Sequence, residues 1–523
     1  MQTINALFAT AVARFGERAA LIEPVESAEM SVLSYRALQE RARGFAGYLQ
    51  QQKIAQGERI IIWSASRSDW MAAYLGALLL GIVVVPLDVN TREDFLERIA
   101  AATGARLLIA TRKQFDGLKQ GNLPFVDIDD LPQGPLDADS LPTVQPDDLA
   151  ELVFTSGTTG QPKGVMLSHA NITSNAIAAL AVVRITADDK MLSILPLSHM
   201  FEMTIEIALF HSGGSCVYAR SLVPDTLLRL LATQHITCMV LVPQALQLFL
   251  NGIEREVRRQ NREQAFQMLQ RVAGYLPFSW RRVLFASVHK RFGGHFHFFV
   301  SGGAYLPPKI ARLWELMGFR VLQGYGATEC SPVISVTPIN DHSYESVGKP
   351  LPGVEVRVAD DHEILVRGPN VALGYWENPE ATAASFKDGW YYTGDLGELD
   401  ARGNLFLRGR KKNLIVLANG LNVYPEDVEN VLHTFPQIKD AVVLGLMEDR
   451  GGPQVHAILL MDDPTEAKTV IQQANKRLAP QQQVRGFTIW SDGDFPRTHT
   501  LKVKRQDVLT RLDTLHQQAK AES

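Results

Sequence analysis

Strand-like and helix-like segments alternate regularly in the first part of the chain. Residues 59–63 and 83–87 are rich in Ile and Val and predict strands, and residues 69–80 between them predict a helix. A helix at residues 92–102 and a strand at residues 106–110 continue the alternation. Strands separated by helices favour a parallel sheet that helices cover. The alternation therefore predicts an α/β fold.

The same alternation resumes beyond residue 190. With 523 residues, 46% of them hydrophobic, the chain is long enough for more than one core. We expect two doubly wound halves, at about residues 1–185 and 186–330, packed together with a cleft between them. The strands expected in the second half are residues 191–195, 216–218, 237–241, 296–300 and 320–323.

The pattern changes after residue 330. Short strands separated by Gly and Pro predict a small antiparallel β-barrel or sheet at about residues 331–409. A charged break around Arg410 follows, and beyond it lies a compact segment of strands and helices. We therefore expect a large N-terminal domain of residues 1–410 and a small, mobile α+β C-terminal domain of residues 411–523.

Charge and cysteine content argue against several classes of protein. The formal net charge of −4 is atypical of a nucleic-acid-binding protein. Three scattered cysteines without a CxxC pair predict a reducing compartment and no structural zinc. Residues 70–87 carry no charge, but Gly81 and Pro86 interrupt them, which favours a buried helix and strand over a membrane span. We expect a soluble, cytoplasmic protein.

A dense cluster of hydroxyl, glycine and lysine residues follows the apolar run at residues 152–154 and precedes a helix expected at residues 170–183. Glycine lets backbone N–H groups turn toward an anion, hydroxyls add donors, and lysine supplies a mobile positive charge. An ordinary Gly/Thr-rich turn is the alternative, but the density of these residues favours a phosphate-binding loop. The candidate ligands are Thr155, Ser156, Gly157, Thr158, Thr159, Gly160 and Lys163.

This loop resembles the signature loop of the adenylate-forming superfamily, which includes acyl-CoA synthetases, peptide-synthetase adenylation domains and luciferases. In that family the loop holds the β- and γ-phosphates of ATP. The resemblance extends motif by motif, in the family's order, from the N-terminal helix to Arg505. It implies ATP, Mg²⁺ and a carboxylate substrate.

Three further turns resemble the nucleotide site of the family, although each alone is compatible with an ordinary connection. Glycines let a flat ring approach the backbone, a tyrosine can stack on a base, and a carboxylate can bind magnesium or accept ribose hydroxyls. The resemblance implies catalytic roles for Thr328 and Glu329, with Glu329 holding the Mg²⁺ of Mg-ATP. The residues implied for adenine and ribose are Gly302, Gly303, Ala304, Gly324, Tyr325, Gly326, Asp395 and Arg410.

Residues 496–505 resemble the family's Pro-x-Thr-x-x-Gly-Lys-x-x-Arg motif. The match implies that Lys502 is the catalytic lysine, which neutralises charge growing between the carboxylate and the α-phosphate. Leu501 stands where the family has Gly, and Leu reaches positive φ only at a cost. Either Leu501 takes an ordinary φ or the assignment moves to Lys504. The flanking Pro, Thr and Arg keep register with Lys502, so we prefer Lys502.

Three other roles follow from the resemblance alone. His199 and Phe201 match an aromatic segment that lines the carboxylate entrance, and we expect them to line the acyl pocket rather than to act as acid or base. Lys412 falls at the hinge of the small domain. Gly420 and Leu421 match the segment that faces the pantetheine channel during thiol transfer.

Residues 253–291 contain nine Lys or Arg and three Glu, interleaved with aromatic and aliphatic residues. Such a surface can lie on an anionic membrane or attract the phosphates of CoA, although a solvated helix pair has the same composition. The sequences around Phe201 and Gly302 look most like those of long-chain fatty-acyl-CoA synthetases.

The resemblance implies activation of a medium- or long-chain fatty acid by ATP to acyl-AMP, with release of pyrophosphate, and then transfer to coenzyme A. Two alternatives remain. An acyl-AMP ligase would load the phosphopantetheine of a carrier protein instead. A catalytically impaired acyl-nucleotide-binding protein would transfer an acyl group neither to coenzyme A nor to a carrier protein. Leu501 in place of Gly is the only feature that supports this alternative.

Overall fold

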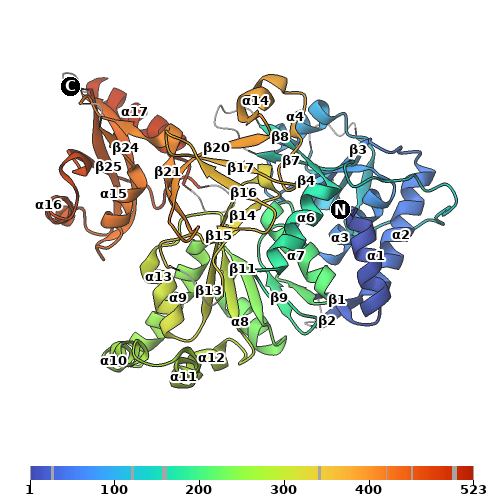
Figure 1. Ribbon diagram of the computed structural model, residues 1–523, viewed down its shortest axis with the longest axis horizontal. Helices are drawn as coiled ribbons and strands as arrows, with labels where there is room; N and C mark the ends of the chain where they lie inside the picture. The colour runs from blue at the N-terminus through green and yellow to red at the C-terminus, as the bar shows by residue number, and fades with distance from the viewer. Residues whose placement is uncertain are drawn as a thin grey trace. The chain divides into compact units, whose positions relative to one another are not determined.

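The chain forms two compact units in the computed structural model (Figure 1). Unit 1 comprises Met1–Val356 and Val366–Tyr391, and unit 2 comprises Arg357–Leu365 and Tyr392–Ser523. The division expected at residue 410 stays a prediction, because the boundary between the units falls inside strands on its N-terminal side. The described residues are 2–24, 29–118, 123–155, 162–339, 343–419, 421–448, 452–497 and 503–521.

The first sheet of unit 1 has seven strands in the order β18-β8-β7-β4-β3-β5-β6. The central strands run parallel, as the alternation predicts, whereas β7 pairs antiparallel with β8. The strands are β3 (Arg59–Trp63), β4 (Val83–Leu87), β5 (Leu107–Ala110), β6 (Phe125–Asp127), β7 (Leu149–Thr155), β8 (Lys163–Ser168) and β18 (Gly374–Tyr375). The helices of this part are α2 (Tyr35–Gln51), α3 (Ser68–Leu79), α4 (Glu93–Thr103), α5 (Arg112–Asp116) and α6 (His169–Leu180).

The uncharged run at residues 70–87 forms a buried helix and a buried strand, as expected. All but the last residue of α3 are buried, and so is every residue of β4. In the part of the chain that the structure describes, no helix has both the length and the apolar character needed to cross a bilayer.

The second sheet of unit 1 has nine strands in the order β15-β14-β13-β12-β11-β9-β10-β1-β2. Strands β1 and β2 come from the N-terminal part of the chain but belong to this second sheet. The two sheets are therefore not separated by the division expected near residue 185. Strand β1 lies parallel to β10, with Leu21 opposite Cys216, and its four central residues are buried. The strands are β1 (Ala19–Pro24), β2 (Met30–Ser34), β9 (Lys190–Ser193), β10 (Ser215–Tyr218), β11 (Cys238–Leu241), β12 (Phe298–Ser301), β13 (Arg320–Gly326), β14 (Val333–Val336) and β15 (Lys349–Pro350).

Aromatic side chains fill the core beside the second sheet. The rings of Phe292, Phe299, Trp314 and Phe319 contact one another at centroid distances of 4.9–6.1 Å. These buried rings fix the position of the strand ends that carry the candidate site. The helices of this part are α1 (Ile4–Phe15), α7 (Met200–Ser212), α8 (Pro224–Thr233), α9 (Pro243–Arg259), α10 (Glu263–Ala273), α11 (Phe278–Leu284), α12 (Ala286–Arg291) and α13 (Pro308–Leu316).

The short strands expected after residue 330 form a five-stranded sheet. In the described residues the expected barrel or sheet is thus a sheet. The boundaries between the two units fall within three of its strands, β16, β17 and β20. The strands are β16 (Glu355–Val358), β17 (Glu363–Arg367), β19 (Phe386–Lys387), β20 (Trp390–Leu399) and β21 (Leu405–Arg410), and helix α14 (Pro379–Ser385) precedes β19.

Unit 2 has its own core of aliphatic side chains. Strands β24 and β25 form a long antiparallel pair, β26 extends it in parallel, and α15 packs against β24. The elements are β22 (Ile415–Val416), β23 (Asn422–Val423), α15 (Pro425–Leu432), β24 (Ile438–Glu448), β25 (Gly452–Met461), α16 (Ala467–Asn475), β26 (Gly486–Ile489) and α17 (Arg505–Ala521).

Candidate active site

The candidate phosphate loop connects two antiparallel strands. Thr155 ends β7, Lys163 begins β8, and these two residues are opposite each other in the register. The helix expected at residues 170–183 is α6, and strand β8, which the sequence did not predict, lies between the loop and this helix. The hairpin brings Lys163 back beside the start of the loop. Ser156, Gly157, Thr158, Thr159 and Gly160 lie outside the described residues, so their roles stay predictions.

Tyr375 connects two residues that the sequence assigns to the phosphates and the metal. The Nζ of Lys163 lies 4.8 Å from the centroid of the Tyr375 ring. The Tyr375 hydroxyl donates a hydrogen bond of 2.9 Å to Oε1 of Glu329. Burial and the neighbouring Glu329 raise the pKa of Tyr375, so the hydroxyl remains a donor. Lys163 and Glu329 are 166 residues apart in sequence and meet through one side chain.

Hydrogen bonds to the main chain hold the short helix that carries Glu329, residues Thr328–Cys330, in place. The carbonyl of Glu329 accepts from the N–H of Ala372 at 2.9 Å. The Nδ2 of buried Asn370 donates to the carbonyl of Cys330, also at 2.9 Å. Thr204 on α7 donates to the carbonyl of Ser331 at 2.9 Å. The segment that carries Glu329 is therefore tied to two other parts of unit 1, residues 370–372 and helix α7.

Sequence reasoning missed Tyr375 and Asn370. Both lie between residues 370 and 375, outside every motif that we singled out. Strand β18 pairs with β8, with Tyr375 opposite Val165, and this pairing places the tyrosine beside Lys163. The local signal in the sequence is a tyrosine directly after a glycine, Gly374. In the structure Gly374 has a φ of +134°, which suits few other residues.

The turn assigned to adenine lies next to the residue assigned to the acyl pocket. Gly302 and Gly303 follow β12, and Gly303 has a φ of +78°, which favours glycine. A methyl group on Gly302 would lie 3.1 Å from Cζ of Phe201 and 3.4 Å from the carbonyl oxygen of Gly324. Phe201, in the first turn of α7, therefore packs against the Gly302 backbone. The two residues, assigned separately from sequence, therefore pack together in unit 1.

The remaining nucleotide candidates of unit 1 lie at the end of β13 or just beyond β12. Tyr325 is 8% exposed, so its ring is mostly packed rather than open to a base. A methyl group on Gly326 would overlap the Pro332 carbonyl oxygen at 1.9 Å, so packing alone requires glycine there. Thr328, which precedes Glu329 in the chain, and Ala304, which follows Gly303, are both half-buried. His199, also half-buried, caps the start of α7 through its backbone.

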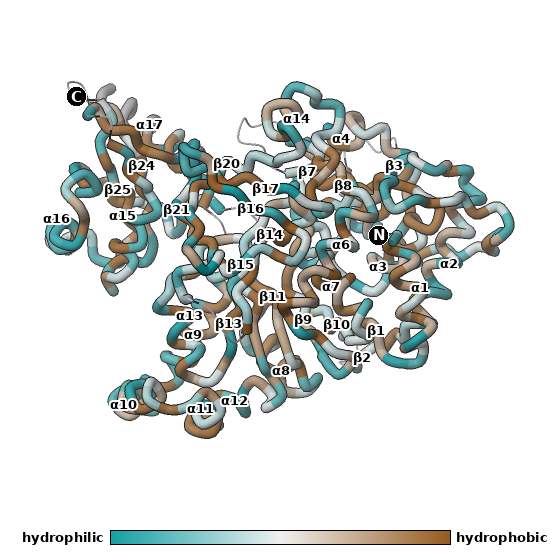
Figure 2. The backbone as a smooth tube through the Cα atoms, viewed as in Figure 1, coloured by the Kyte–Doolittle hydropathy of each residue, from teal (hydrophilic) through white to brown (hydrophobic). Residues whose placement is uncertain are grey.

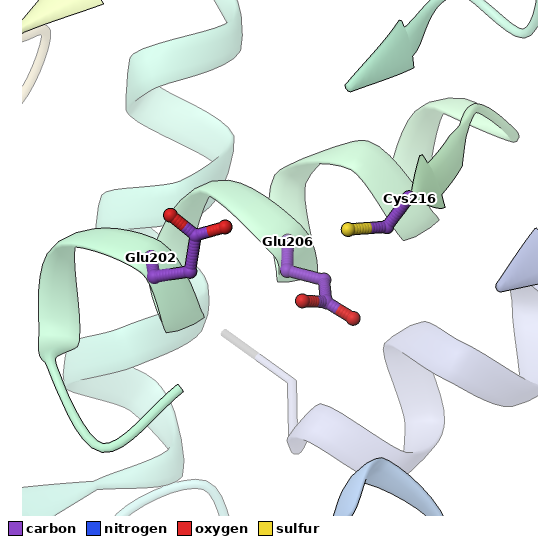
Figure 3. A group of neighbouring side chains, drawn as sticks. All are labelled: Glu202, Glu206 and Cys216. Atoms are coloured by element: carbon purple, nitrogen blue, oxygen red, sulfur yellow. The ribbon is translucent and has the colours of Figure 1, made fainter. Parts of the chain in front are cut away.

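A buried acidic cluster lies along α7, which begins beside His199 (Figure 3). Glu202 and Glu206 on the helix and Cys216 on β10 have ligand-type atoms within 4.8 Å of one another, and all three side chains are buried. The Tyr218 hydroxyl donates to Oε1 of Glu206. Burial raises the pKa of Glu206 to about 8 and the pKa values of Glu202 and Cys216 above their usual ranges. Burial therefore favours the neutral form of all three side chains.

In unit 2, the two residues assigned to the ribose contact each other. Asp395 on β20 and Arg410 on β21 are opposite in the register, and Nε of Arg410 lies 2.8 Å from Oδ1 of Asp395. Gly394, with a φ of +68°, donates its N–H to Glu363 at 2.9 Å, and Lys411 donates to the other oxygen of Glu363. The carboxylate of Asp395 is 8% exposed and held by its own strand pair.

The other candidates of unit 2 are only partly described. Lys412 lies exposed in the short helix Lys411–Asn413, and Leu421 is 48% exposed. Gly420, Leu501 and Lys502 lie outside the described residues. Lys504 is described, and its Nζ lies 3.8 Å from Asp507. Their assigned roles stay predictions.

Known proteins resemble this chain over most of its length. The family model for AMP-binding enzymes matches residues 8–376. The long-chain-fatty-acid–CoA ligase of Escherichia coli O157:H7 is 28% identical, over 97% of this chain and 94% of that protein. The medium-chain fatty-acid–CoA ligase of E. coli K12 is 29% identical, over 92% and 86%. The o-succinylbenzoate CoA synthetase of Bacillus subtilis, solved with ATP and magnesium ion, has a TM-score of 0.78 at 25% identity, over 96% and 98%.

Proposed function

The chain belongs to the AMP-binding enzyme family, and from this premise we propose that it is an acid–thiol ligase that forms acyl-CoA from a fatty acid, ATP and coenzyme A. The carboxylate oxygen of the acid attacks the α-phosphorus of ATP, and the bond to pyrophosphate breaks. The thiol of CoA then attacks the acyl carbon of acyl-AMP, and AMP leaves. The first step needs no general base, because the carboxylate is already ionised. In the second step the thiol loses its proton to solvent as the bond from sulfur to the acyl carbon forms, and the bond to AMP breaks.

The observation that carries this proposal is the contact chain Lys163–Tyr375–Glu329. Lys163 supplies positive charge for the departing pyrophosphate. Glu329 fits a magnesium ligand, because Tyr375 fixes one carboxylate oxygen at 2.9 Å and leaves the other for a hard cation. Bound Mg²⁺ would neutralise phosphate charge. The protein's part is to hold the lysine and the carboxylate at a fixed separation before ATP arrives.

The proposal assigns the remaining roles to both units. Phe201 and Gly302 form the wall between the acyl chain and the adenine, supported by their packing contact. Asp395 and Arg410 bind the ribose hydroxyls, Lys502 stabilises the first transition state, and Gly420 and Leu421 border the pantetheine. Lys412 is the hinge about which the small domain turns between the two steps.

Fatty acids are the proposed substrates because both E. coli relatives are fatty-acid–CoA ligases by name. Fatty acids and acyl-CoA are amphiphilic, and we extend the proposal to peripheral contact with an anionic membrane. A carrier protein is the alternative thiol donor.

A panel of carboxylic acids from C4 to C18, assayed by pyrophosphate release and by thioester formation, tests the proposal. We expect pyrophosphate release with fatty acids and acyl-CoA formation with free CoA. Accumulation of acyl-AMP without a thioester would favour the carrier protein as acceptor. Absence of pyrophosphate release with every acid would favour an impaired nucleotide-binding protein.

A further inference from the structure

Exposed apolar side chains are concentrated on the α10–α12 segment of unit 1. Large hydrophobic side chains there are 40–92% exposed, and Figure 1 places α10, α11 and α12 together at the lower edge of the view. Figure 2 shows hydrophobic backbone positions at α11 on this edge. The five side chains, which we call the α10–α12 face, are Met268, Val272, Tyr275, Trp280 and Val283.

The helix α10 has two apolar stripes, and only one of them packs against unit 1. Phe266, Leu269 and Ala273 contact the aromatic core of the second sheet. Met268 and Val272, spaced four residues apart, are exposed on another side, at 66% and 40%. A helix that only closed the core would need a single stripe. The second stripe therefore indicates a partner outside the described fold.

The charged side chains that follow Glu263, the first residue of α10, are all basic up to the end of α12. Residues 264–291 contain five Lys or Arg and no Asp or Glu. Arg281 and Arg282 donate to backbone carbonyls, and Arg291 pairs with Glu256 at 3.7 Å. Among the described residues, Arg271 and Lys290 are exposed and lie within ion-pairing distance of no carboxylate. Two cations are thus available to an anionic partner.

A pocket of about 470 Å³ lies beside the face and combines both chemistries. Arg282 and Lys290 line it with positive charge, and Val283 and Ala286 line it with apolar surface. An anionic phosphate attached to an alkyl chain matches this combination, because the phosphate meets the cations while the chain meets the apolar side chains.

We propose that the α10–α12 face docks on an anionic phospholipid bilayer. Tyr275 and Trp280 lie at the level of the headgroups, where amphipathic rings are favoured, and Met268, Val272 and Val283 reach the acyl boundary. Arg271 and Lys290 meet lipid phosphates. The use of such docking rests on the proposed function, since fatty acids partition into membranes, but the docking itself does not require catalysis.

Sedimentation of the full chain with vesicles tests the proposal. We expect binding to vesicles of phosphatidylcholine with 30% phosphatidylglycerol, weaker binding as salt rises, and little binding to phosphatidylcholine alone. The variant Tyr275→Ser/Trp280→Ser/Val283→Ser should lower the partition coefficient about tenfold or more, and Arg271→Gln/Lys290→Gln should do so on anionic vesicles only. These side chains are exposed, so both variants should keep the wild-type melting temperature.

The matched control is Leu222→Ser/Val223→Ser, which removes two side chains of similar exposure, 64% and 57%, from elsewhere on unit 1. This variant should bind vesicles as the wild type does. Equal loss in all three variants, no binding by the wild type, or self-association of the wild type that only the apolar variant abolishes would overturn the proposal. Adenylation of a soluble acid without vesicles should be unchanged in every variant. If the wild-type protein does not adenylate any acid, the proposed function is contradicted, but the vesicle-binding result still supports the docking proposal.

Discussion

At the scale of single residues, Tyr375 is the side chain on which the candidate site depends most. Its ring lies below Lys163 and its hydroxyl is bonded to Glu329, so one residue sets the separation of two charged groups. A cation over a ring is attracted by the ring face, and the hydroxyl bond to a carboxylate is charge-assisted. The two contacts can be removed separately by substitution.

The variant Tyr375→Phe should keep the ring below Lys163 and lose the hydrogen bond to Glu329. A hydrogen bond to a charged group contributes about 1.5–3 kcal/mol, so the Mg²⁺ concentration for half-maximal pyrophosphate release should rise about tenfold. Tyr375→Leu should also raise the KM for ATP, because the ring is lost. An unchanged magnesium requirement in Tyr375→Phe would contradict this role, provided that its melting temperature equals that of the wild type.

Glu206 gives the protein a pH-dependent stability. Its pKa is raised from 4.5 to about 8 by burial, so the folded state keeps a proton that the unfolded state releases. The contribution of this group to stability is therefore present below about pH 4.5 and is lost as the pH rises toward 8.

The variant Glu206→Gln keeps an oxygen for the Tyr218 hydroxyl and cannot ionise. Its melting temperature should fall less steeply between pH 5 and pH 8 than that of the wild type, with a difference in unfolding free energy of the order of a few kcal/mol across this range. Thermal unfolding in buffers of constant ionic strength measures both slopes. Parallel slopes would mean that Glu206 does not hold the proton.

At the scale of elements, an ion pair between half-buried Arg505 and buried Glu429 joins three segments of unit 2. Arg505 begins α17, and its guanidinium lies 2.7 Å from Oε2 of Glu429 on α15 and 2.8 Å from the carbonyl of Val443 on β24. Oε1 of Glu429 accepts from the N–H of the same Val443. Removal of one partner leaves the other charge buried and unpaired.

The variant Arg505→Met should lower the unfolding free energy of unit 2 by about 3–5 kcal/mol. The double variant Arg505→Met/Glu429→Gln should recover most of the loss, because the amide oxygen still accepts from Val443 without a net charge. Urea unfolding followed by circular dichroism compares the variants. If the double variant is as unstable as Arg505→Met, packing rather than charge explains the loss.

At the scale of the whole molecule, the candidate residues are divided between the units. Lys163, Glu329 and Phe201 belong to unit 1, and Asp395, Arg410, Lys412 and Lys502 belong to unit 2. If the two chemical steps use different residues of unit 2, substitutions there should separate the steps. Substitutions at Lys163 should affect adenylation.

The variant Lys502→Ala should abolish pyrophosphate release from ATP and acid, because the growing negative charge loses its cation. Thioester formation from supplied acyl-AMP should be largely intact. Lys504→Ala, which removes the contact with Asp507 at 3.8 Å, is the matched control and should adenylate normally. The opposite pattern in the two variants would move the catalytic assignment to Lys504.

The sequence by itself determined many of the segments that become strands and helices. Strands β3 and β4 occupy the residues expected for them. The uncharged run at residues 70–87 forms the buried helix and strand that the sequence favoured over a membrane span. These features depend on side-chain periodicity and turn residues within one or two dozen positions, and the sequence displays such local patterns directly.

Tertiary structure alone decided which distant segments meet. It placed β1 and β2 in the second sheet, inserted β8 after the phosphate loop, and brought Tyr375 between Lys163 and Glu329. It also buried Glu206 beside Cys216 and exposed a second apolar stripe on α10. These outcomes depend on packing between residues far apart in the chain, and no local pattern encodes the identity of a packing partner.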